Sequence, residues 1–339
     1  MIEFLMEYGL FLLKVITVVI GIIAIIMVTA LAGRKGTHEG LEVENLNEKH
    51  ELLVQALRTA VLSKDQQKNE AKERKKKDKA AAKVASTRPR SFVIDFKGDL
   101  KASAVPSLRQ EVNAILDVAT SEDEVIVRLE NYGGVVHEHG LAASQLVRIR
   151  DQNIPLNVCV DKVAASGGYL MACVATKIYA APFAILGSIG VLAQIPNFNR
   201  LLDSHGVDFE QVTAGKYKRS VTMFGENTDE DRAKLKEELE DVHMLFKDVV
   251  TAYRPDMDLE KIATGEHWYG TRALELELVD YIQTSDQLLS ARAATHDIYL
   301  VTYKIKQSLQ RRLMGGIDSA FQKTDAARWR QKFESSLPR

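Results

Sequence analysis

The sequence Ser166-Gly167-Gly168 is the feature of this chain with the clearest chemical meaning. An apolar run, Leu156 to Val160, precedes it and is typical of a buried strand, and residues 169–176 after it are typical of a helix. A serine at a strand-to-helix turn is held on a tight bend beside the free N–H groups of the helix start, which favours a nucleophile. The alternative is a helix-capping serine followed by two glycines that allow close packing.

A serine nucleophile needs a base, and two kinds of side chain are available. Lys218 follows Gly215 closely and is flanked by the cations Lys216 and Arg219, which favour the neutral amine that a general base requires. Lys216 is the rival base, and an exposed basic turn is the alternative explanation of both lysines. His137 follows a Gly-Gly turn and is the histidine nearest to the candidate site, although it stands in no strong motif.

Two more glycine motifs follow predicted strands. Gly133 and Gly134 come after the strand pattern 124–129, where backbone N–H groups can point at a ligand, as an oxyanion hole requires. Ser188 stands between Gly187 and Gly190, after the apolar run 178–181. Each motif has a plain glycine turn as its alternative.

These four motifs occur in the order Gly-Gly, Ala-Ala-Ser-Gly-Gly-Tyr, Gly-Ser-Ile-Gly-Val and Gly-Lys-Tyr-Lys. Together they resemble the signal peptide peptidase SppA family across residues 90–290. The resemblance implies a ClpP-like, crotonase-type fold with a Ser/Lys dyad, in which Ser166 is the nucleophile, Lys218 the general base and Ser188 the group that orients the lysine. It also implies an oxyanion hole made by backbone N–H groups of Gly133 or Gly134 and of Gly167.

One departure from the family pattern lies beside the predicted oxyanion hole. The family often has Ser-Pro before its Gly-Gly pair, whereas this chain has Asn131-Tyr132. Without proline the backbone loses a fixed φ at this point, which affects the shape of the pocket floor but leaves the backbone donors in place.

The N-terminal residues predict a membrane anchor. Val15 to Ala32 is a run of 18 residues without a charge, and with the apolar residues 8–13 before Lys14 it is long enough to cross a bilayer. A cleaved signal peptide is the alternative, but the run is too long for a usual signal core and acidic rather than basic residues precede it. We therefore expect a retained single-pass anchor in the cell inner membrane, with the lipid bilayer as a partner.

The side of the membrane that holds the catalytic domain is predicted differently by two observations. Arg34 and Lys35 follow the apolar run, and the positive-inside rule then favours a cytoplasmic catalytic domain. The family resemblance implies the opposite, periplasmic side.

The predicted fold class is α/β, with repeated ββα units and a largely parallel sheet. It comprises a transmembrane anchor (1–35), a charged helical linker (36–90), the peptidase domain (91–290) and a C-terminal extension (291–339). Strand patterns alternate with helical ones in the peptidase domain; the strands are 92–96, 124–129, 156–160 and 177–181, and the helices are 105–118, 139–150 and 228–253. In the linker, Leu46, Leu53 and Leu57 predict a helix with a narrow apolar seam.

Composition narrows the partners. The net charge of −1 gives no global basic field for nucleic acid, and the basic stretch Lys64 to Lys83 has no interleaved aromatic residues, so that a solvated helix or contact with anionic lipid explains it better. Cys159 and Cys173 lie in apolar segments and are expected to pack as small hydrophobic residues. No Cys/His cluster has metal-ligand spacing, and we expect neither a metal nor a cofactor.

The sequence thus predicts a membrane-anchored serine endopeptidase that cleaves peptides or unfolded proteins, such as signal-peptide remnants, within a homo-oligomeric ring implied by the resemblance. One alternative is an acyl-CoA enzyme on the same fold, for which Glu130 is the single acid next to the Gly-Gly turn. The other is a non-catalytic, ring-forming membrane scaffold.

Overall fold

The computed structural model describes residues 2–32, 39–63, 65–67 and 88–305. The chain divides into two compact units, residues 41–303 and the two ends of the chain, and helix α1 (Ile2–Ala32) belongs to the ends. Among the residues that the structure describes, no helix combines the length and the apolar character needed to cross a membrane. The predicted single-pass anchor is therefore unsupported by the structure.

The larger unit alternates strands and helices. Its strands, together with the one that crosses its C-terminal boundary, are β1 (Gly40–Asn45), β2 (Arg90–Gly98), β3 (Glu124–Asn131), β4 (Leu156–Val160), β5 (Val163–Ala165), β6 (Lys177–Ala180), β7 (Ile185–Gly187), β8 (His267–Tyr269), β9 (Tyr281–Ile282) and β10 (Asp297–Lys304). Its helices are α2 (Leu46–Val61), α4 (Val105–Leu116), α5 (Val136–Asp151), α6 (Gly167–Cys173), α7 (Asn199–Ser204), α8 (Asp229–Tyr253), α9 (Leu259–Ile262), α10 (Gly270–Glu275) and α11 (Ser285–Ala293).

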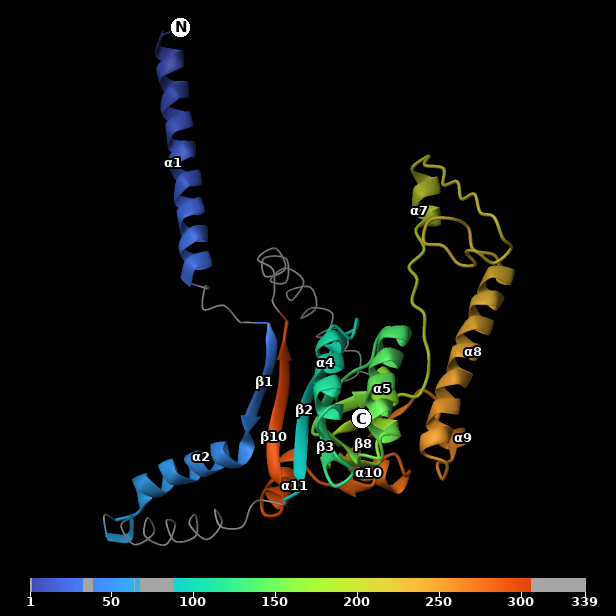
Figure 1. Cartoon of the computed structure of the whole chain (residues 1–339). Helices are drawn as coiled ribbons and strands as arrows, with labels where there is room; N and C mark the ends of the chain where they lie inside the picture. The colour runs from blue at the N-terminus through green and yellow to red at the C-terminus, as the bar shows by residue number, and fades with distance from the viewer. Residues whose placement is uncertain (1, 33–38, 64, 68–87, 306–339) are drawn as a thin grey trace. The chain divides into compact units, whose positions relative to one another are not determined.

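The strands form one sheet with the order β1-β10-β2-β3-β4-β6-β9 (Figure 1). From β10 to β9 every neighbouring pair is parallel. A short branch leaves this path, because β5 pairs in parallel with both β3 and β7, and β7 pairs antiparallel with β8. The predicted α/β class with a largely parallel sheet is confirmed, as are the predicted strands and helices of the peptidase domain.

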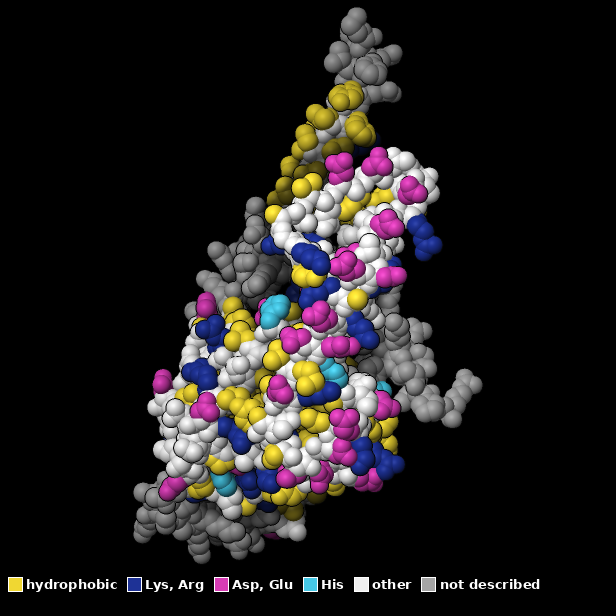
Figure 2. All heavy atoms as spheres, turned by 90° about the vertical axis from the view of Figure 1, so that its right-hand side faces the viewer, with side chains coloured by type: hydrophobic (Ala, Val, Ile, Leu, Met, Phe, Trp, Pro, Cys, Tyr) yellow, Lys and Arg dark blue, Asp and Glu magenta, His cyan; other side chains and the backbone are white. Residues whose placement is uncertain are grey.

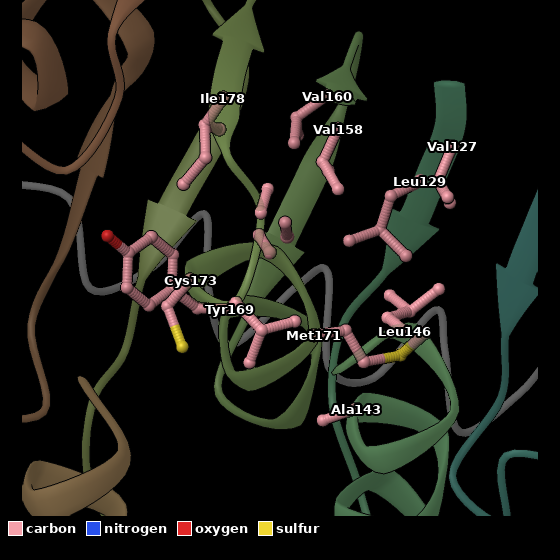
Figure 3. Close-up of a cluster of buried hydrophobic side chains, with 14 of the residues drawn as sticks. Val127, Leu129, Ala143, Leu146, Val158, Val160, Tyr169, Met171, Cys173 and Ile178 are labelled. Atoms are coloured by element: carbon pink, nitrogen blue, oxygen red, sulfur yellow. The ribbon is translucent and has the colours of Figure 1, made fainter. Parts of the chain in front are cut away.

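The central strands are buried on both faces, which explains their nearly continuous apolar sequences. On one face, Leu129, Val158 and Ile178 pack against Leu146 of α5 and Met171 of α6 (Figure 3). Alternate residues of the same strands face the other way, where a smaller cluster packs beneath α11; its members are Val93, Ile126, Cys159, Tyr179, Leu288 and Ile298. This alternation is the period of two expected for strands.

The sequence patterns missed several short strands, and two of them change the interpretation of the site and of the linker. Val163–Ala165 forms β5, so the serine turn follows β5 rather than β4. Residues 40–45, inside the predicted helical linker, form β1 and join the sheet beside β10. The linker helix itself is α2; in the predicted leucine seam Leu53 and Leu57 are exposed, whereas Leu46 is half-buried against the smaller core cluster. Most of the basic stretch 64–83, and residues 306–339 of the predicted C-terminal extension, lie outside the described residues.

Candidate active site

Ser166 stands on a strained bend between β5 and α6. Its backbone has φ 53° and ψ −120°, a positive-φ conformation that a residue other than glycine rarely adopts. Its N–H donates to the carbonyl oxygen of Gly187 at 2.8 Å, and its carbonyl accepts the N–H of Leu170 at 3.0 Å, so both sides of the bend are tied down. Such strain persists where the surrounding structure over-determines it, and it is concentrated at functional sites.

The two glycines after Ser166 are required for packing as well. A Cβ on Gly167 would lie 2.5 Å from Cγ of His139, and a Cβ on Gly168 would lie 2.2 Å from the carbonyl oxygen of Asn131. The start of α6 is therefore pressed against the end of β3 and the first turn of α5. The close-packing explanation of the glycines is correct, and it is compatible with a nucleophile because it brings backbone N–H groups near Ser166.

The Gly133-Gly134 turn lies directly against the serine. Gly133 has φ +87°, and a Cβ there would approach Cβ of Ser166 to 2.7 Å and the nitrogen of Gly167 to 2.8 Å. The N–H of Gly133 donates to Oδ1 of Asn131 at 2.8 Å. None of the hydrogen bonds in the described part of the chain uses the N–H of Gly134 or of Gly167. The described structure thus leaves two donors unused, Gly167 directly after Ser166 and Gly134 directly after Gly133.

Ser188 is brought to Ser166 by strand register. Strands β5 and β7 are parallel, with Ala165 opposite Gly187, so the next residues along each strand are the two serines. Ser188 also has a positive φ, of 53°, and its N–H donates to the carbonyl of Glu266 at 2.6 Å. Both serines are half-buried and lie at the same end of adjacent strands.

Lys218 lies elsewhere. Residues 191–227, here called the excursion, leave the sheet after Ser188 and return at α8, and Figure 1 shows α7 beyond the N-terminal end of that helix. The backbone hydrogen bonds described for the excursion stay within it, including the N–H of Lys218 to the carbonyl of Gly215 at 3.2 Å. No described hydrogen bond or ion pair joins Lys218 to Ser166 or to Ser188.

Lys216, the rival base, is held by other side chains. Lys216 forms an ion pair with Glu230 at 3.1 Å and lies over the ring of Tyr217. Hydrogen bonds to Tyr217 and to Glu230 raise the pKa of Lys216, which favours its charged form. Because a general base must be neutral to accept a proton, this environment disfavours Lys216 in that role.

The other groups near the glycine turn have different roles from those expected. His137 is exposed, with Nε2 3.8 Å from a carboxylate oxygen of Glu138. The histidine behind the glycine turn is instead His139, which is fully buried, lies 3.2 Å from Oδ1 of Asn131, and was missed because its spacing matches no motif. Glu130, the acid needed for acyl-CoA chemistry, forms an ion pair with Lys162 at 3.0 Å, which disfavours that alternative.

Comparison with known proteins identifies the family of this chain. Residues 3–146 match the family described as peptidase family S49 N-terminal, and residues 148–298 match peptidase family S49. The chain belongs to peptidase family S49. The glycine turn lies in the first matched region and the serine bend in the second.

Relatives in family S49 support the same conclusion. The chain is 45% identical to a probable protease SohB of Haemophilus influenzae, across 91% of each chain. It is 44% identical to a probable protease SohB of Buchnera aphidicola subsp. Schlechtendalia chinensis, across 86% of this chain and all of that one. A putative signal peptide peptidase SppA of Enterococcus faecium is 28% identical across 49% of each chain. The predicted resemblance to the SppA family is confirmed, and family membership supports a serine-type peptidase activity.

Proposed function

We propose that this chain is a serine endopeptidase in which Ser166 and Lys218 form a catalytic dyad on a ClpP/crotonase-like fold. Neutral Lys218 takes the Oγ proton as Oγ of Ser166 bonds to the carbonyl carbon of a peptide. The tetrahedral intermediate collapses, the C–N bond breaks, and Lys218 gives the proton to the leaving amine. Water then attacks the acyl carbon as Lys218 accepts its proton; the bond between that carbon and Oγ breaks, Lys218 returns the proton to Oγ of Ser166, and the product with the new carboxyl group leaves.

The observation that carries this proposal is the strained bend at Ser166, with two backbone donors beside it. The N–H groups of Gly134 and Gly167 have no partner among the described hydrogen bonds; Gly167 follows Ser166 in the chain, and Gly134 follows Gly133, which packs against Ser166. Donors fixed in place before reaction stabilise the negative charge that develops on the peptide oxygen. Ser188, next to Ser166 in strand register, then accepts a hydrogen bond from the lysine and orients it.

Lys218 reaches Ser166, in this proposal, at a contact between subunits of a homo-oligomeric ring. The excursion exposes apolar side chains that a single chain does not cover: Val212 is 95% exposed and Leu192 is 60% exposed. The face that carries α8 mixes acidic and basic side chains with apolar ones (Figure 2). Exposed apolar patches of this kind mark interaction sites, and burying them against a second copy would fix the position of the excursion.

Extended peptides are the substrates that this proposal favours, including signal-peptide remnants and unfolded membrane or envelope proteins. We also propose that the protein acts at the cell inner membrane. Carbonate extraction of cell membranes tests this location: a protein that stays in the membrane pellet supports an anchor, and one released to the supernatant refutes it.

Hydrolysis of casein by the purified full-length chain tests the dyad. Wild type is compared with Ser166→Ala and Lys218→Ala, and Lys216→Ala is the matched control, since it removes a neighbouring lysine. We expect wild type and the control to cleave casein and the other two variants to be inactive with unchanged assembly by size-exclusion chromatography. Activity in Lys218→Ala would refute the lysine base, and an inactive wild type would favour the scaffold.

A further inference from the structure

Asn131 and His139 form a fully buried polar pair behind the glycine turn. Asn131 is the last residue of β3, and His139 lies in the first turn of α5; both have an exposed fraction of 0%. Oδ1 of Asn131 lies 3.2 Å from Nε2 of His139. Buried polar side chains lower the free energy of unfolding unless they are hydrogen-bonded, so each polar atom of this pair needs a hydrogen-bond partner.

The amide of Asn131 has a single favourable orientation. Oδ1 accepts the N–H of Gly133 at 2.8 Å, and Nδ2 donates to the sulfur of Met171 at 3.3 Å. Exchanging Oδ1 and Nδ2 would place two donors, the side-chain NH₂ and the N–H of Gly133, face to face. Oδ1 therefore points at both Gly133 and His139, and the hydrogen bond between the two side chains assigns a hydrogen to Nε2 of the imidazole.

The imidazole of His139 also contacts the start of the nucleophile helix. Its Nδ1 lies 3.0 Å from the carbonyl oxygen of Val135, so an acceptor faces each ring nitrogen, and only a ring with a hydrogen on both nitrogens donates to both. Gly167 packs against this ring so closely that a Cβ would lie 2.5 Å from Cγ. One rigid side chain thus touches Gly167 directly and reaches the glycine turn through Asn131.

We propose that Asn131 and His139 are positioning residues that set the distance between the N–H groups of Gly134 and Gly167. This inference rests on the proposed function, in which those two groups bind the oxyanion. The glycine turn has little stiffness of its own, because Gly133 has φ +87° and no proline fixes the backbone between Asn131 and Gly134. In this proposal the buried amide of Asn131 and the imidazole of His139 restrain the backbone of the turn, and neither side chain touches the substrate.

Substitution of His139 tests the pair. His139→Leu keeps apolar volume against Gly167 but removes the donor to Asn131, whereas His139→Gln offers a side-chain N–H in its place. His137→Leu, an exposed position on the same helix, is the matched control. The measurements are the rate of labelling of Ser166 by a fluorophosphonate, which needs the oxyanion hole, and kcat and KM for casein-derived peptides, with assembly and thermal unfolding recorded for each variant.

The expected result is a split between the kinetic constants. Loss of a whole oxyanion donor costs about 100- to 1,000-fold in kcat, so a misplaced donor in His139→Leu should lower labelling and kcat by about 10- to 100-fold. KM should stay within about twofold of wild type, because the interaction is made in the transition state. His139→Gln should recover most of the rate, and His137→Leu should match wild type.

Three results would overturn the inference. A folded His139→Leu that labels at the wild-type rate would show that the ring sets nothing, and a His139→Gln as slow as His139→Leu would show that the ring acts by packing alone. Absence of labelling in wild type itself would refute the proposed function, and the inference with it. If His139→Leu does not fold, Asn131→Ala provides the second measurement, since it removes the acceptor of Gly133, and an unchanged kcat there would equally refute the restraint.

Discussion

Gly168→Ala is the substitution whose effect the structure defines most sharply. A Cβ at this position would lie 2.2 Å from the carbonyl oxygen of Asn131 and 3.0 Å from its carbonyl carbon. Carbon atoms in proteins prefer separations of about 3.5–4.0 Å, and the obstacle is the backbone of β3 rather than a side chain that could rotate away. The start of α6 and the end of β3 must therefore move apart by about 1 Å.

Such a shift separates the two arms of the proposed oxyanion hole. A misplacement of about 1 Å in an active site can cost about 100-fold in rate, and overpacking of a well-packed core typically costs about 1–3 kcal/mol in the free energy of unfolding. We therefore expect Gly168→Ala to lose about 100-fold in casein hydrolysis and to unfold at lower urea concentration than wild type.

Gly140→Ala is the matched control for this experiment. Gly140 lies in α5, and a Cβ there meets nothing within 4 Å. Alanine is favoured over glycine inside a helix by about 1 kcal/mol, so this variant should keep its activity and gain a little stability. Wild-type activity and stability in Gly168→Ala would refute the close approach of α6 to β3, whatever Gly140→Ala does.

Three further results follow from the titratable groups. Burial raises the pKa of Glu111 from 4.5 to about 7, so the folded protein holds this proton more tightly and loses stability as the pH rises through that range. Glu111→Gln should therefore raise the free energy of unfolding at pH 8 by up to about 3 kcal/mol and leave it unchanged at pH 4; an equal effect at both pH values would contradict this origin. Burial also raises the pKa of Cys159 and of Cys173 to about 12, so neither thiol should react with iodoacetamide at pH 8 until urea unfolds the protein, and mass spectrometry of the native protein would reveal any exception. Peptide hydrolysis should rise from neutral to alkaline pH, because only a neutral lysine can accept the serine proton, and a falling rate with the protein still folded would count against Lys218.

The strands of the sheet could be predicted because their cause is local. Residues 92–96, 124–129 and 156–160 are apolar almost throughout, and such runs are stable only as strands covered on both faces. Strand β5 could not be predicted in the same way. It has three residues and exists because β3 and β7 lie on either side of it, which no local pattern records.

The candidate site divides along the same line. The serine and the glycines were recognisable, because glycines at the end of a strand indicate a tight turn, and a serine in such a turn is a typical nucleophile position. His139 was not recognisable, because a histidine in the first turn of a helix is ordinary until the fold places it 3.2 Å from Asn131. The pairing of the glycine N–H groups was also undecided until Gly133 was found to donate to Asn131.

The sequence by itself determined the family, the α/β alternation and the serine bend, since each depends on residue types at short spacing. Tertiary structure alone decided that Ser188 lies beside Ser166, because parallel register joins residues far apart in the chain. It also decided that Lys216 is paired with Glu230 and that, among the described hydrogen bonds, the N–H of Gly133 is used while those of Gly134 and Gly167 are not. Two groups form a hydrogen bond or an ion pair only when they are close in space. Sequence spacing between residues of different helices or strands carries little information about that distance.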